Sequence, residues 1–140
     1  MYPFIQKFHS GWAYLALLLL VVVVINSLIG FVSKKEFAPK DKKIALFGLI
    51  ATHIQLVVGL LLYFVSPVGF AQLGNMEKNI RLTSLEHPLI NIIAITLITI
   101  GWSKHKKALY SQDKFKSILL FFGLGLLLIL SKIPWSLWIK

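Results

Sequence analysis

Four long apolar runs dominate this chain and leave little choice of fold. They cover residues about 9–32, 44–65, 84–102 and 117–137, and the first run contains no charged residue. Each is close to the length of about 20 mostly apolar residues that a helix needs to cross a bilayer. In a chain of 140 residues, four such spans leave room only for ends and loops. The sequence therefore predicts a single domain, residues 1–140, that is all-α: an integral membrane antiparallel four-helix bundle embedded in the lipid bilayer.

The positions of the basic residues predict how the bundle is oriented. Loops 33–43 and 103–116 carry five lysines each, and the remaining cations are Lys7, Lys78, Arg81, Lys132 and Lys140. Cytoplasmic loops hold the excess of positive charge in membrane proteins. We therefore expect both lysine-rich loops inside and both termini with loop 66–83 outside, in a multi-pass protein of the bacterial cytoplasmic (inner) membrane. The lysines themselves are interpreted as topology determinants and contacts to anionic lipids.

Composition excludes several classes of function. The chain has no cysteine, which excludes disulfides, iron–sulfur clusters, thiolate zinc sites and cysteine nucleophiles. Its net charge of +10 would suit a nucleic-acid binder if the charges formed a patch on a soluble fold. They lie instead in clusters between apolar runs, so no nucleic-acid partner is expected.

Small and polar residues recur at helical spacing along each run, as expected of faces that pack against neighbouring membrane helices. The four stripes are His9, Ala13, Ala16, Leu20, Val23, Ser27 and Gly30; Gly48, Thr52, Gln55, Gly59 and Tyr63; His87, Asn91, Ala94, Ile98 and Gly101; and Phe122, Gly125, Ile129 and Lys132.

Two histidines, His9 and His87, stand at the outer ends of the first and third stripes. The residues one and two turns below them are mostly small, which leaves room between the helices for a flat porphyrin with one imidazole on each face of its iron. Either histidine could instead be a polar residue at the water boundary. Counting along the spans places His9 about 10 Å above His87, at about 1.5 Å per residue.

The other two histidines have different settings. His53 lies near the middle of the second span and off its small-residue stripe. It is interpreted as a neutral hydrogen-bonding residue, with ligation of a metal at a second site as the alternative. An ion or proton pathway through His53, Thr52, Gln55 and Asn91 is a further reading, which no mid-membrane carboxylate supports. His105 falls among lysines in a loop and is expected to be solvated.

Charged and aromatic residues gather near the outer ends of the third and fourth runs. Lys132 is expected either to extend to water or to pair with a haem propionate. Thr83 and Glu86 match a capping box at a helix start, with Pro88 in the first turns. The aromatic residues near this level are interpreted as an interfacial belt; they are Trp12, Tyr14, Trp135 and Trp138.

Three segments resemble successive helices of one half of the haem A synthase and cytochrome b family. They are FHSGWAYLALLLL with His9, ATHIQLVVGLLLYF with Gln55 and Gly59, and LEHPLINIIAITLI with His87, and LLILSKIPW closes a fourth helix. The resemblance implies a four-helix bundle with His9 and His87 as axial ligands of a haem, and with residues 55–59 lining the haem slot. The family's synthases usually have arginine after the first ligand where this chain has Ser10, so the resemblance implies haem binding rather than synthase activity.

The function expected from these features is electron transfer by a b-type haem near the outer face. The predicted cofactor is haem b, with His9 and His87 as metal ligands and with Ala13, Ala16, Gln55, Gly59, Asn91 and Lys132 around it. A quinol and a membrane redox complex are the expected partners, and a homodimer would supply the second bundle of the larger family members. The alternative is a cofactor-free accessory or scaffold subunit of a larger membrane complex, since such subunits also pack through small residues.

Overall fold

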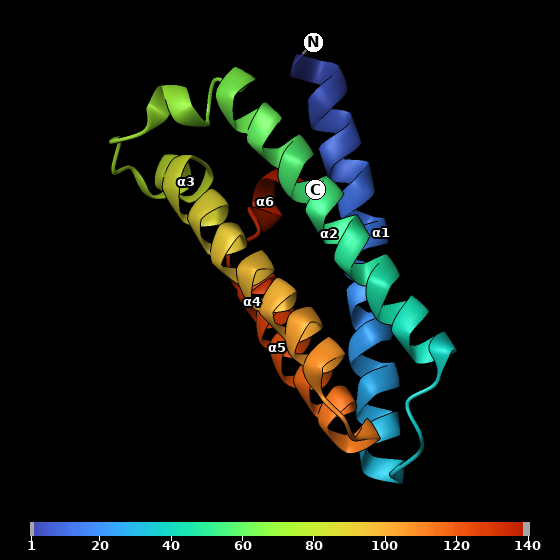
Figure 1. Cartoon of the computed structure of the whole chain (residues 1–140). Coiled ribbons are helices and arrows are strands. Elements are labelled where there is room, and N and C mark those ends of the chain that lie inside the picture. The colour runs from blue at the N-terminus through green and yellow to red at the C-terminus, as the bar shows by residue number, and fades with distance from the viewer. Residues whose placement is uncertain (1, 139–140) are drawn as a thin grey trace.

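The computed structural model describes residues 2–138, and these form a helical bundle (Figure 1). The long helices are α1 (Tyr2–Ser33), α2 (Pro39–Val65), α4 (His87–Lys107) and α5 (Ser111–Ser131). The helical turns α3 (Lys78–Arg81) and η2 (Leu82–Glu86) run directly into α4, and two short helices are separate, η1 (Phe70–Gln72) and α6 (Trp135–Trp138). Four helical segments are long and apolar enough to cross a membrane, which confirms the four predicted spans. Lys140, counted among the outer cations, lies outside the described residues.

The helices extend further at the lysine-rich end than the apolar runs predicted. α2 starts at Pro39 because the proline occupies the first turn, where its missing N–H costs nothing, and because the Asp41 carboxylate accepts the Ala38 N–H at 2.8 Å. α4 continues through its lysines to Lys107, and α5 already begins at Ser111. The apolar runs therefore predicted only the part of each helix that lipid can surround, and each helix continues beyond its run into charged residues.

The prediction of an unbroken fourth run to residue 137 was wrong. α5 ends at Ser131, and the chain turns through Lys132 before Pro134 starts a new turn that becomes α6. Proline disfavours a helical conformation in the residue before it, which explains the break.

The predicted capping box at Thr83 and Glu86 was also wrong. The helix begins five residues earlier, at Lys78, where the Glu77 side chain accepts the Ile80 N–H at 3.1 Å. Thr83 donates instead to the Ile80 carbonyl at 3.1 Å, inside the helix. Leu82–Glu86 form a π-helical turn just before Pro88, which has no N–H to offer the Ser84 carbonyl. The Tyr63 hydroxyl of α2 donates to that carbonyl at 2.8 Å.

Each long helix contacts two neighbours: α1 packs against α2 and α5, and α4 packs against α2 and α5. The buried residues of α1 all belong to the predicted first stripe, and they are Ala16, Leu20, Val23, Ser27 and Gly30. In the other helices the stripes are also buried at Gly48, Thr52, Ala94, Ile98, Gly101, Phe122, Gly125 and Ile129. Large apolar side chains on the opposite faces are exposed, as lipid contact requires.

The two lysine-rich connections lie at one end of the bundle, and the N-terminus and the connection 66–77 lie at the other (Figure 1). Hydrogen bonds hold the lysine-rich connections together: the Phe37 N–H donates to Ser111 Oγ at 2.8 Å, and Gln112 Nε2 donates to the Phe31 carbonyl at 3.1 Å. The ten lysines of these segments therefore belong to one end of the molecule.

Candidate functional site

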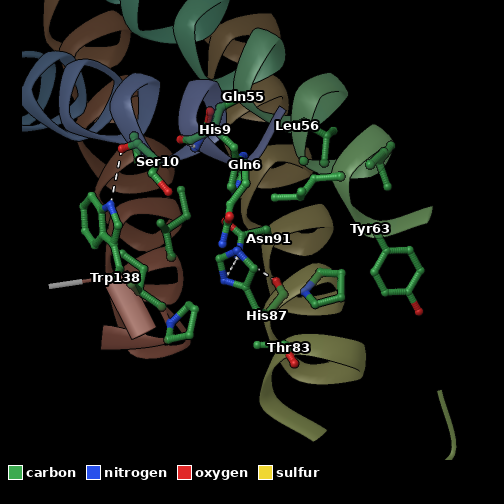
Figure 2. Close-up of a pocket in the computed structure, with 18 of the residues that line it drawn as sticks. Gln6, His9, Ser10, Gln55, Leu56, Tyr63, Thr83, His87, Asn91 and Trp138 are labelled. Atoms are coloured by element: carbon green, nitrogen blue, oxygen red, sulfur yellow. Dashed lines mark hydrogen bonds between the residues drawn. The ribbon is translucent and has the colours of Figure 1, made fainter. Parts of the chain in front are cut away.

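A cavity of about 220 Å³ opens between the helices near the end that carries the N-terminus (Figure 2). Its wall comes from all four long helices, from the connection after α2, from η2 and from the C-terminal residues 133–138, and it is mostly apolar with a few polar side chains. Seven of the eight residues predicted to surround a cofactor line it: His9, Ala13, Ala16, Gln55, Gly59, His87 and Asn91. The eighth, Lys132, does not.

The two histidines face each other at this cavity from α1 and α4. Their ring centres are 6.2 Å apart and their planes are nearly perpendicular, at 82°. Because α4 extends to Lys107, the count along the helices that gave an offset of about 10 Å gives only about 6 Å from the observed helix ends.

The ring of His87 is oriented by the end of α5. Its Nδ1 lies 2.9 Å from the Lys132 carbonyl oxygen. A carbonyl can only accept, so Nδ1 carries the proton and donates it, and Nε2 keeps a free lone pair. Asn91 Nδ2 donates to the His87 carbonyl at 2.6 Å and steadies the same turn of α4. Asn91 Nδ2 also lies 3.2 Å from the protonated Nδ1, where it is a close contact, so Nε2 is the ring nitrogen left to accept a bond.

The ring of His9 is held by α2. Gln55 Nε2 donates to the His9 carbonyl at 2.8 Å, and Gly59 lies beside the ring. A Cβ atom at position 59 would lie 3.0 Å from His9 Cε1, so any larger residue there would push the ring away by a few tenths of an ångström or more. His9 Nδ1 and Gln55 Oε1 are both buried and have no hydrogen-bond partner.

A group of charged side chains lies next to His87. Glu86 pairs with Arg81 at 2.7 Å and with Lys132 at 3.3 Å. Both cations are about two-fifths exposed, so solvent screens these pairs and each adds little stability. The Lys132 ammonium is thus bound to Glu86, while its carbonyl is the group that reaches His87.

His53 lies away from this cavity. Its Nδ1 is 2.7 Å from the Leu49 carbonyl and its Nε2 is 3.2 Å from the Thr99 hydroxyl of α4. Both ring nitrogens thus have hydrogen-bond partners, one within α2 and one on α4, in agreement with the interpretation as a hydrogen-bonding residue. Within residues 2–138, no group of three or more His, Cys, Asp or Glu side chains is arranged to hold a metal ion.

The expectation that His105 is solvated was wrong. His105 is 1% exposed, in the last turn of α4, where Phe37 and Trp102 pack against it. The lysines around it suggested a loop, but the helix continues through them and turns His105 inward.

Sequence reasoning also missed a buried carboxylate, Asp41, which is 2% exposed. It accepts hydrogen bonds from Asn26 Nδ2 at 3.0 Å, Lys35 Nζ at 3.1 Å and the Ala38 N–H at 2.8 Å. Its place two residues after Pro39 was the available signal, because acidic residues favour the first turn of a helix. The cluster is fully paired and lies at the lysine-rich end, so it stabilises the junction of α1 and α2.

Two of the predicted belt tryptophans bind the helices to one another. Trp12 Nε1 donates to the Ala51 carbonyl of α2 at 2.9 Å, and Trp138 Nε1 donates to the Ser10 carbonyl of α1 at 3.3 Å (Figure 2). Trp138 also lines the cavity and stacks on Tyr14, with ring centres 4.7 Å apart. The C-terminal turn thereby closes one side of the cavity.

No protein-family model, curated protein or solved structure matches this chain.

Proposed function

We propose that this protein is a b-type cytochrome, a membrane protein that binds haem b between His9 and His87 and transfers electrons. The observation that supports this most directly is the separation of the two imidazole rings, 6.2 Å between centres. Two imidazoles on opposite sides of one metal atom have ring centres about 6 Å apart, because a metal–nitrogen bond is about 2 Å long and each nitrogen lies about 1 Å from its ring centre.

The surroundings of the two rings support a haem rather than a bare metal ion. Two nitrogen ligands do not complete the shell of a protein-bound transition metal, but they complete the axial positions of a haem iron. His87 has its Nδ1 proton satisfied and its Nε2 free, and His9 has a buried nitrogen without a partner. The small side chains of Ala13, Ala16 and Gly59 widen the cavity beside the rings.

The haem would supply one-electron redox chemistry, and the chain would supply its ligands, its orientation and a low-polarity setting. His9 and His87 would both hold the haem, which would leave its iron no open position for a substrate and favours electron transfer over oxygen chemistry. We propose a quinol as the electron donor and a membrane redox partner as the acceptor. A homodimer would place two such sites in one assembly.

We also propose the membrane orientation that the lysines predict. In an antiparallel bundle, the ten lysines of the two connections at one end would face the cytoplasm, and both termini and the connection 66–77 would lie outside. The haem cavity would then lie near the outer face of a bacterial cytoplasmic membrane.

An absorption spectrum of the detergent-purified protein tests the cytochrome proposal. After expression with ample haem, we expect Soret and alpha bands in the reduced-minus-oxidised spectrum. His9→Ala and His87→Ala should each abolish these bands or change them to those of a five-coordinate haem, while circular dichroism shows that the helices remain. His53→Gln is the matched control and should keep the wild-type bands, because His53 does not line the cavity.

A folded wild-type protein without haem bands would contradict the proposal and would favour the accessory-subunit alternative. Loss of the bands in His53→Gln, with His9→Ala unaffected, would contradict the assignment of the ligands.

A further inference from the structure

The two histidines of the cavity differ in how their second ring nitrogen is satisfied. Nδ1 of His87 donates to the Lys132 carbonyl, whereas Nδ1 of His9 is buried without a partner. An imidazole that binds a metal through Nε2 carries a proton on Nδ1, and such protons almost always find an acceptor, which orients the ring and makes it a stronger ligand. On the α1 side of the cavity, Nδ1 of His9 has no such acceptor among residues 2–138.

The side-chain amide of Gln55 has a buried oxygen that receives no hydrogen bond from the described residues. Its side chain lies on α2 one turn before Gly59, and its amide nitrogen donates to the His9 carbonyl at 2.8 Å. Because a carbonyl only accepts, the nitrogen must be the end of the amide that faces it, and the oxygen is the other end. This Oε1 is buried and receives no hydrogen bond. Gln55 is thus anchored beside His9 with an unused acceptor.

We propose that Gln55 is the positioning residue of His9: its Oε1 accepts the Nδ1 proton of His9 when Nε2 binds the haem iron. Helix α2 then supplies no ligand, but it determines which nitrogen of His9 is free to bind. Gly59 serves the same arrangement, since it lets the ring lie against α2. This inference rests on the proposed haem site.

The strength of the acceptor should control the redox potential. An acceptor that draws the Nδ1 proton makes the imidazole a better electron donor, which stabilises ferric over ferrous iron and lowers the potential. A carboxylate at position 55 would be a stronger acceptor than the amide, and an aliphatic side chain would be none. Substitutions to Glu and to Leu should therefore move the potential in opposite directions.

The experiment compares purified wild-type protein with Gln55→Leu, Gln55→Glu and the control Gln112→Leu, by haem titration and by redox titration. Gln112 likewise donates to a carbonyl of α1, that of Phe31 at 3.1 Å, but it does not line the cavity. We expect Gln55→Leu to weaken haem binding about 10- to 100-fold, as loss of an outer-shell partner typically does. A tenfold larger loss for ferric than for ferrous haem would raise the potential by about 59 mV.

Gln55→Glu should lower the potential, and Gln112→Leu should match wild type. If Gln55 only ties α1 to α2, both substitutions at position 55 would shift the potential in the same direction or leave it unchanged, and either result would overturn the inference while the haem proposal stands. If Gln55→Leu does not fold, Gln55→Glu decides alone, since a potential at or above that of wild type refutes the proposed role. Wild-type protein without haem bands would refute both proposals together.

Discussion

At the scale of single residues, the site depends on small side chains that leave space beside His9. Gly59 lacks the Cβ atom that would press on His9, and Ala13 and Ala16 leave space below it. The buried polar groups of the molecule differ in how they are paired. Asp41, at the lysine-rich end, is fully paired, as a structural role requires, whereas His9 Nδ1 and Gln55 Oε1 at the cavity have no hydrogen-bond partner among residues 2–138. Unpaired buried groups are costly, so in a native protein they point to a missing partner.

Gly59→Val tests the importance of this space. The added side chain would displace the His9 ring, so we expect the haem content per protein to fall well below that of wild type. Gly11→Val is the matched control on α1, because a Cβ atom at Gly11 meets nothing within 4 Å. Its haem content, measured as the ratio of Soret to protein absorbance, should be unchanged. Equal haem content in the two variants would contradict this prediction, because it would show that haem binding does not depend on the space that Gly59 leaves for the His9 ring.

At the scale of helices, close approach of α4 and α5 depends on glycine. A Cβ atom at Gly125 would lie 2.6 Å from the Ile98 side chain and 3.0 Å from the Ala94 carbonyl oxygen. The latter belongs to the backbone and cannot rotate away, so the helices would have to separate. This matters for the site, because the end of α5 carries the Lys132 carbonyl that orients His87.

Gly125→Leu should therefore destabilise the bundle by about 1–3 kcal/mol, the usual cost of overpacking a core. Gly123→Leu is the control one half-turn away, where an added Cβ atom meets no neighbour, and its effect should stay within about 0.5 kcal/mol. Unfolding in mixed detergent micelles, followed by circular dichroism, measures both. A larger loss for Gly123→Leu would contradict the packing of α4 on α5.

At the scale of the whole molecule, the two ends differ strongly in charge. Ten lysines lie in segments 33–43 and 103–116, on the helix ends and turns at one end of the molecule, and the cavity lies towards the other end (Figure 1). A membrane with a negative inner surface would hold this asymmetric molecule in one orientation.

Cysteine labelling tests that orientation. Because the chain has no native cysteine, only the introduced residue can be labelled. Asn75→Cys lies in the connection between η1 and α3, and Lys107→Cys lies at the last residue of α4. We expect a membrane-impermeant maleimide to label Asn75→Cys in intact cells, and to label Lys107→Cys only after the cells are broken. The opposite pattern would place the cavity on the cytoplasmic side and contradict the proposed orientation.

Four helices apolar enough to cross a membrane, and most of their buried faces, could be predicted from the sequence, because both depend on local patterns of apolar, small and charged residues. Seven residues that line the cavity could also be predicted from these patterns. Three features are known only from the folded structure: the distance between the rings of His9 and His87, the contact of the Lys132 carbonyl with His87, and the burial of His105. These features depend on where helices end and how they incline to one another, and both are set by contacts between distant segments that no local pattern records.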